Sequence, residues 1–309
     1  MVAVVLGFVG AVMFGAADFI GGLASKRISA MKVTFISGLV GFGIAIVGSL
    51  VVPSVMSWPA IFWGAMAGVV GSAAIMLLYA SLAIGPMSIL SPLGAFVSAV
   101  VPVTWALTTG ESLGAFGLAG IGLGLVAVVL VGFVPEKNAV RPSLTGLAMA
   151  IGAGILIGAF LIFIDQAPSD AGLIPLMANR IVSASIMGIS IAILAGMRAR
   201  RRRAASANAI AGSSATTTPG ESSARDSFAA GWRPGLRLAA LGGVIDGTGN
   251  ALLLLGIQLG DLSVMSVLTA MYPAGTILLA SVVLKERVAP VQAIGLALAI
   301  AAAALLALG

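Results

Sequence analysis

The sequence predicts an all-α membrane protein of ten transmembrane helices, arranged as two inverted five-helix repeats, and three observations predict this fold class. Hydrophobic residues make up 60% of the 309-residue chain and charged residues only 8%, whereas roughly a quarter of the residues in a soluble domain are charged. Apolar runs of about 20 residues, long enough to cross the hydrocarbon core as a helix, recur along the chain. The second half of the sequence also repeats the first. A soluble globule of this size is therefore excluded.

The predicted spans are ten apolar runs separated by charged residues, Pro or Gly. They cover approximately residues 2–24, 31–52, 59–82, 86–109, 112–134, 143–164, 171–196, 236–259, 262–284 and 289–308. Lys26 and Arg27 follow the first run rather than precede it, so we interpret this run as a retained span and not as a signal peptide. The connection at about 197–235 is rich in Ala, Ser, Thr, Gly and Arg. This composition predicts a disordered cytoplasmic loop.

Positive charge is confined to alternate loops. Of the 16 Lys and Arg residues, 15 lie in the loops after the first, fifth, seventh and ninth spans or within two residues of these loops, and Arg180 lies inside the seventh span. The positive-inside rule therefore places these loops in the cytoplasm and both chain termini outside, in a cell inner membrane. The net charge of +6 lies in one Arg-rich loop and a few short turns. Because it forms no foldable basic face, a nucleic-acid partner is not expected.

The chain contains no Cys and no His. The absence of Cys excludes disulfides, thiolate metal sites and Cys nucleophiles. The absence of His removes the commonest metal ligand and the commonest general base. We therefore expect no metal and no cofactor, and most membrane enzyme chemistry is excluded.

An internal repeat divides the chain into units at residues 1–134 and 143–309. A shift of 175 residues aligns the end of the first unit with the end of the second, with 12 identities in the 47 positions from 65 to 111 and no gap. A shift of 143 lays Gly15 on Gly158 and Ser37 on Arg180. Each unit has five predicted spans, an odd number, so the second unit must be inverted relative to the first. Inverted repeats point to alternating access, with a substrate site near the midplane between the halves.

The ends of both repeats carry a pattern of small residues, Pro, Glu and Gly. In the second half these residues are Ser266, Pro273, Glu286 and Gly295, and in the first half Ser91, Glu111 and Gly120, with Ser98 at the position of the Pro. In this pattern the chain resembles the ten-span drug/metabolite transporters built from two EamA domains, over nearly its whole length. The resemblance implies movement of small metabolites or drugs, often export. It also implies cytoplasmic termini, in contrast to the charge bias.

Ionisable side chains inside spans are the main candidates for function, because each is costly in lipid unless it is paired or hydrated. Asp246 lies near the middle of the eighth span, and Asn250, four residues later, shares its helix face. Arg180 lies within the seventh span and Asp18 nearer one end of the first. Hydrogen bonds to a substrate could also come from Gln258, Tyr79 and Thr269.

Two interpretations of Asp246 and Arg180 stay open. In one, they form a buried ion pair that locks two helices together. In the other, Asp246 takes up a proton on one side of the membrane and releases it on the other, and Arg180 holds a carboxylate of an anionic substrate. Asp18, near a helix end, can also reach interfacial water without any functional role.

Proline and glycine mark where helices bend or pack closely. Pro92, Pro102 and Pro273 lie within the fourth and ninth spans, as hinges for a rocking motion or as simple kinks. Gly-rich and Ala-rich faces in the fifth and tenth spans favour a static helix interface or a homodimer contact.

The sequence therefore predicts a secondary transporter of small molecules. Since no nucleotide-binding motif is present, we expect any active transport to draw on an ion gradient or on another protein. One alternative is an intramembrane lipid-modifying enzyme, which would need Asp18 and Asp246 to converge as an acid and base pair. The other is an uncoupled facilitator, or a membrane protein in which the repeat serves only as a scaffold.

Overall fold

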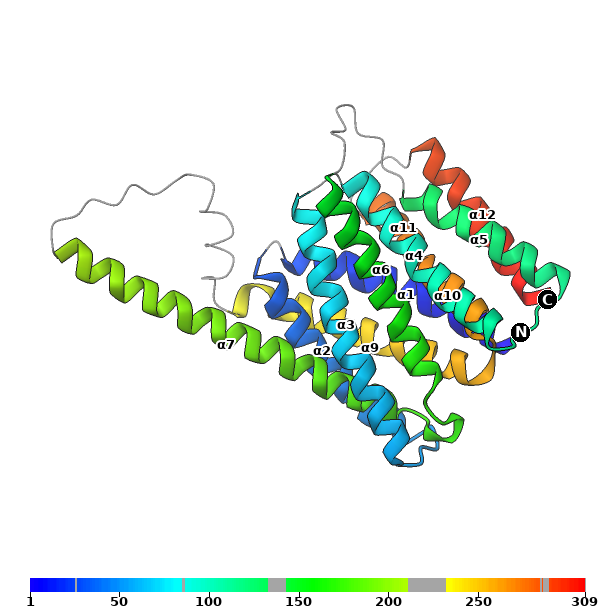
Figure 1. Ribbon diagram of the computed structural model, residues 1–309, viewed down its shortest axis with the longest axis horizontal. Helices are drawn as coiled ribbons and strands as arrows, with labels where there is room; N and C mark the ends of the chain where they lie inside the picture. The colour runs from blue at the N-terminus through cyan, green and yellow to red at the C-terminus, as the bar shows by residue number, and fades with distance from the viewer. Residues whose placement is uncertain are drawn as a thin grey trace.

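The computed structural model describes residues 1–25, 27–84, 87–132, 143–210, 232–283, 285 and 289–308. These residues form helices and no strand, which confirms the predicted all-α class. Figure 1 shows the bundle. Its helices are α1 (Val2–Ser25), α2 (Ala30–Ser49), α3 (Trp58–Ile84), α4 (Met87–Thr108), α5 (Ala115–Gly132), α6 (Leu144–Asp165), the 3-10 turn η1 (Ser169–Ala171), α7 (Ile174–Ile210), α9 (Arg233–Leu259), α10 (Leu262–Ala270), α11 (Tyr272–Val283) and α12 (Pro290–Leu308).

The predicted spans are present as helices. Nine stretches in the described part of the chain are long and apolar enough to cross a membrane. The remaining predicted span is α4, whose apolar part in the same search is Leu93–Thr108. The protein is therefore a multi-pass membrane protein.

Both chain termini lie at the same end of the bundle in Figure 1, as an even number of crossings requires. This end also contains the connections 50–57, 109–114 and 166–173, and we call it the terminal face. The opposite end carries Arg27 and Arg233, and we call it the basic face.

The span predicted at 262–284 as one helix is two helices in the structure. α10 ends at Ala270, Met271 caps it through hydrogen bonds from its N–H to Leu268 and Thr269, and α11 begins at Tyr272. Pro273 lies in the first turn of α11, where a missing N–H costs nothing because it would have no helical partner. The sequence located the bend correctly but did not predict a complete break.

The predicted start of the disordered loop at 197 is wrong. α7 continues to Ile210, and Figure 1 shows its C-terminal part projecting past the other helices. Ala and Arg are strong helix formers, so a run of them keeps the helix going after the apolar residues end. Residues 211–231 lie outside the described part, and α9 begins at Arg233, before the predicted end of the loop at 235.

The short helix α10 is the centre of the bundle. All of its residues except Thr269 are buried, and it packs against α1, α4, α5, α6 and α9. Around it, α1 packs along α9, α6 along α3 and α5 along α12. Small residues allow these close approaches, because helices in lipid associate mainly through direct packing.

Candidate functional site

An ion pair inside the bundle joins the two charged residues that the sequence singled out. The Nη2 atom of Arg180 lies 2.7 Å from Oδ2 of Asp246, and the two side chains are 12% and 25% exposed. Arg180 belongs to α7 and Asp246 to α9. The pair therefore connects two helices through residues that are 66 positions apart in the sequence. The sequence named both residues and left their pairing open. The structure brings them together.

Asn250 holds the same carboxylate from within α9. Its Nδ2 donates to Oδ1 of Asp246 over 3.2 Å and to the Asp246 backbone oxygen over 2.9 Å. The two carboxylate oxygens therefore have different partners, Asn250 on Oδ1 and Arg180 on Oδ2. This is the shared helix face that the spacing of four residues predicted.

A glycine on α2 lets Arg180 reach across. Both α7 and α9 pack against α2, and Gly41 lies between them. A Cβ atom at Gly41 would lie 3.1 Å from Nε of Arg180, and a Cβ at Gly247 of α9 would lie 2.8 Å from the Gly41 Cα. The guanidinium therefore occupies space that any side chain at position 41 would take.

The Arg180 guanidinium has buried N–H groups that make no hydrogen bond within the described part of the chain. Its Nε and Nη2 atoms are buried and make no hydrogen bond to any residue that the structure describes, although Nη2 is at ion-pair distance from Asp246. A buried donor without an acceptor is unfavourable by about 1–3 kcal/mol. A ligand oxygen or a water that accepts a hydrogen bond from this guanidinium would therefore stabilise the site.

Asp18 of α1 lies beside this pair. α1 approaches α9 where a Cβ at Gly242 would be 3.7 Å from the Ala17 oxygen and 3.8 Å from the Gly21 nitrogen. Asp246 is one helical turn beyond Gly242, and the charges of Asp18 and Asp246 repel each other. The two acids thus lie on facing parts of α1 and α9, and Asp246 already has Arg180 as its partner.

Asn250 also reaches a narrow apolar pocket. The pocket lies between α6, α7 and α9, and its other lining residues are Phe160, Ile164, Leu176, Leu253 and Leu254. It places one amide among apolar side chains, next to the ion pair. Its cavity volume is about 10 Å³, which leaves room for about one water molecule, so a substrate could enter only if the surrounding helices moved apart.

Two further predicted residues make contacts at the terminal face. Gln258 donates from Nε2 to the Gly172 oxygen over 3.0 Å. Glu111 accepts from the Ser263 hydroxyl and, over 3.4 Å, from the Ser263 N–H in the first turn of α10. Burial raises the pKa of the Glu111 carboxyl above its ordinary value; the Ser263 N–H opposes this shift, and the charges of Asp261 and Asp165 add to it.

The other predicted residues lie apart from the ion pair or outside the description. Thr269 donates to Met265 within α10, and Pro102 is fully buried in α4, which continues through it. Tyr79 and Pro92 are in α3 and α4, with side chains that are not described, and Glu286 lies outside the described residues.

Sequence reasoning missed Asn179 and Ser263. Asn179 is 5% exposed in α7 and directly precedes Arg180. A second polar residue in an apolar span was the available signal. The shift of 175 residues lays Ser88 on Ser263, but nothing in the sequence pairs Ser263 with Glu111, which is 152 positions away.

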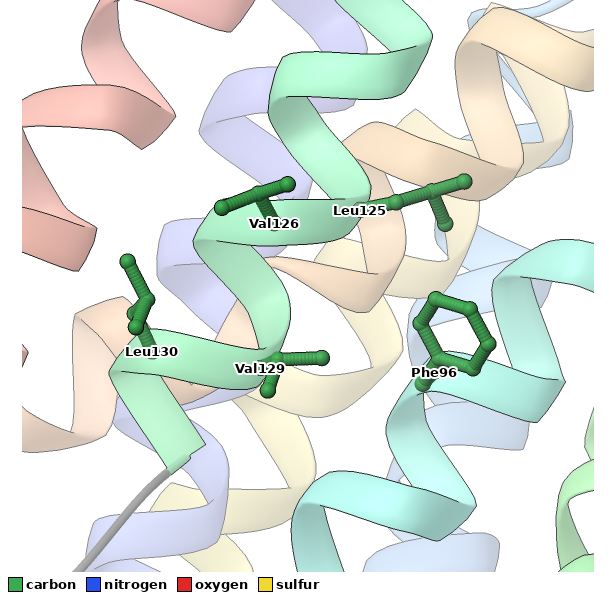
Figure 2. Close-up of a pocket in the computed structure, with 5 residues that line it drawn as sticks. All are labelled: Phe96, Leu125, Val126, Val129 and Leu130. Carbon is green, nitrogen blue, oxygen red and sulfur yellow. The ribbon is translucent and has the colours of Figure 1, made fainter.

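A second pocket, of about 220 Å³, belongs to other helices. Figure 2 shows that Phe96 of α4 and Leu125, Val126, Val129 and Leu130 of α5 line it. All five side chains are hydrocarbon, so this hollow offers no charge or hydrogen bond to a polar substrate. The candidate site is therefore the ion pair between α7 and α9.

Comparisons with known proteins agree with this architecture. The pattern that defines the EamA-like transporter family matches residues 144–308. One solved crystal structure of a protein is 16% identical, covers 99% of this chain and 96% of its own chain, and superposes with a TM-score of 0.68. That similarity shows the fold. No curated protein matches the sequence.

Proposed function

Because this chain belongs to the EamA-like transporter family, we propose that it is a secondary transporter that exports small metabolites or drugs across the inner membrane by alternating access. The observation that carries the proposal is the Arg180–Asp246 ion pair, which lies inside the bundle and leaves the buried Nε of Arg180 without an acceptor among the described residues. Intramembrane charges of this kind typically mark substrate or ion pathways.

We propose further that residues 1–134 and 143–309 are inverted repeats. Helix packing supports this: α1 lies on α9 as α6 lies on α3, and α2 lies on α9 as α7 lies on α3. A Cβ at Gly15 would meet Thr276, and a Cβ at Gly158 would meet Val101. These contacts are equivalent under the two sequence shifts, since 143 relates the glycines and 175 relates Val101 to Thr276. Related halves can exchange conformations, as alternating access requires.

The ion pair also suggests how a proton gradient could be used. Arg stays protonated at any physiological pH, so Asp246 can bind a proton only when it separates from Arg180. A substrate carboxylate that binds Arg180 would release Asp246 for protonation. In this hypothesis substrate binding and proton uptake are coupled through one contact.

The test is a pH measurement inside sealed liposomes that contain the purified protein, under an imposed proton gradient. Amino acids, nucleosides and cationic drugs are added in turn. We expect a substrate-triggered proton flux that Asp246→Asn abolishes and that Asp170→Asn, an exposed acid on the terminal face, leaves unchanged. Transport that persists undiminished in Asp246→Asn would rule out the coupling. A compound that is chemically altered rather than moved would support the enzyme alternative.

A further inference from the structure

One face of α1 is buried at one end and exposed at the other. Its residues are spaced three or four apart, so they form a single stripe along the helix. Val4, Gly7, Ala11 and Gly15 in this stripe are buried, whereas Asp18 and Gly22 are exposed.

The buried part of the stripe faces the centre of the bundle, not lipid. A Cβ at Gly7 would meet Leu268 and Met265 of α10, and a Cβ at Gly15 would meet the backbone of α11. The exposed apolar residues Val5 and Val12 of α1 lie about 100° around the helix from Val4 and Ala11 of the stripe, on a different face. The stripe thus continues from the core to Asp18 and Gly22.

The packing opens where the stripe approaches the basic face. A Cβ at Gly22 would have no atom within 4 Å, and the same is true at Gly21. A face that is covered along most of the helix is therefore uncovered at Asp18. We call this exposed part of the stripe, Asp18 and Gly22, the α1 opening.

Asp18 has no counter-ion in the described structure. The helices packed on α1 are α2, α9, α10, α11 and α12, and their charged residues within the described ranges are Lys32, Arg233, Arg237 and Asp246. Asp246 is paired with Arg180, and the Lys32 ammonium lies 5.2 Å from the Trp232 ring centroid. No described ion pair or hydrogen bond involves Asp18, so its carboxyl group has no partner of opposite charge among these residues.

The surroundings select the kind of cation. A divalent metal ion prefers six or more oxygen ligands, and the described residues contain no group of three acids that could hold one. A single carboxylate beside glycine and apolar side chains instead suits a weakly hydrated cation that carries its own apolar groups.

We propose that Asp18 binds a monovalent organic cation, an amine or quaternary ammonium, that enters through the α1 opening from the basic face. This inference rests on the proposed transport function and names a substrate class for the same site. In this proposal the Arg180–Asp246 pair, which has no net charge, lies beside the cation, and the Asp18 carboxylate supplies the negative charge that binds it.

Thiol labelling tests the charge at the opening without knowledge of the natural substrate. The chain has no Cys, so Gly22→Cys introduces a single thiol where space is open. Trimethylammonioethyl and sulfonatoethyl methanethiosulfonate are applied from the basic face to the full-length protein in liposomes. We expect the cationic reagent to react faster, and the ratio of the two rates to fall by about threefold or more when Asp18→Asn is added, because the two positions are about 6 Å apart.

Matched variants make this result specific. Val12→Cys, on the lipid-facing side of α1, should stay unlabelled, and Asp18→Glu should keep the rate ratio because it keeps the charge. Tetraethylammonium should slow labelling of Gly22→Cys and lose this effect when Asp18→Asn is present. An unlabelled Gly22→Cys, a ratio that Asp18→Asn leaves unchanged, or no protection by tetraethylammonium would overturn the inference.

Transport separates this inference from the proposed function. Charge-selective labelling and protection without movement of any compound in the liposome panel would refute transport and leave the cation site standing. Transport that Asp18→Asn leaves at the wild-type rate would refute the cation site and leave transport standing.

Discussion

Arg180 reaches Asp246 across the surface of α2, where Gly41 leaves room for a guanidinium between α7 and α9. The helices that carry the two charges each pack more extensively on α2 than on each other. The ion pair is therefore a bridge over a third helix, and its geometry depends on all three.

Removing one charge of the pair should destabilise the protein. Asp246→Asn leaves Arg180, which is 12% exposed, without its counter-charge. Breaking a buried pair typically costs about 3–5 kcal/mol, and the partial exposure of Asp246 places the expected loss near the lower end. Thermal unfolding in detergent measures it.

The double variant Arg180→Met with Asp246→Leu is the control, because it removes both charges and keeps the volume. It should recover most of the lost stability while transport stays absent. Full transport by the double variant would show that the pair has only a structural role.

Gly41→Ala should disturb the pair without touching either charge. The added Cβ would lie 3.1 Å from the Arg180 Nε, so the guanidinium must move. Since small misplacements of a functional group are costly, we expect transport to fall by about tenfold. Gly43→Ala on the same helix is the matched control, because a Cβ there meets nothing within 4 Å. Equal activity of the two variants would contradict the bridge.

Gly15→Ala should weaken the contact between α1 and the break in the α10–α11 span. Its Cβ would collide with the backbone oxygen of Tyr272, and backbone cannot rotate away. Overpacking of this kind costs about 1–3 kcal/mol. Gly21→Ala, in open space on the same helix, should be neutral or slightly stabilising because Ala favours helix. The unfolding temperatures of the two variants in detergent test this prediction. Equal unfolding temperatures would contradict it.

Titration of the Glu111 carboxyl should contribute to the pH dependence of the protein's stability. Its pKa is raised from 4.5 in the folded protein, so the folded state binds this proton more tightly than the unfolded chain does. The resulting stabilisation is fully present below pH 4.5 and is lost as the pH rises through the higher folded-state pKa. Glu111→Gln removes this titrating group and should make the fall in unfolding temperature over this range smaller than in the wild type.

Glu111→Ala provides the contrast. It also removes the acceptor for the buried Ser263 hydroxyl and N–H, so it should lower stability by about 1–3 kcal/mol at every pH. A pH profile of Glu111→Gln identical to that of the wild type would exclude Glu111 as the titrating group.

Local patterns in the sequence predicted what depends on neighbours along the chain. The apolar runs located the helices, and the spacing of four residues placed Asn250 beside Asp246. Pro273 marked the irregularity in its span, but the complete break at Met271 also depends on the fit of α1 against α11, which is a tertiary contact.

Contacts between distant segments were beyond such patterns. Arg180 and Asp246 were each conspicuous as charges in lipid, yet their meeting depends on Gly41 of a third helix. The Glu111–Ser263 contact joins the end of α4 to the start of α10, and neither residue's neighbours indicate the other. The helical extension of α7 was missed because an Arg-rich, Ala-rich run has the composition of a disordered loop as well as that of a solvated helix.

The length of α7 gives the protein a mechanical lever. Its 37 residues span about 55 Å, whereas the hydrocarbon core is about 30 Å thick. From Arg180 to Ile210 the helix measures about 45 Å, so a tilt of about ten degrees around the ion pair would swing its tip by about 8 Å. A small rotation at the charged pair would thus give a large displacement of the end of α7 in the aqueous phase. A fluorescent label there would detect it, and a partner protein could respond to it.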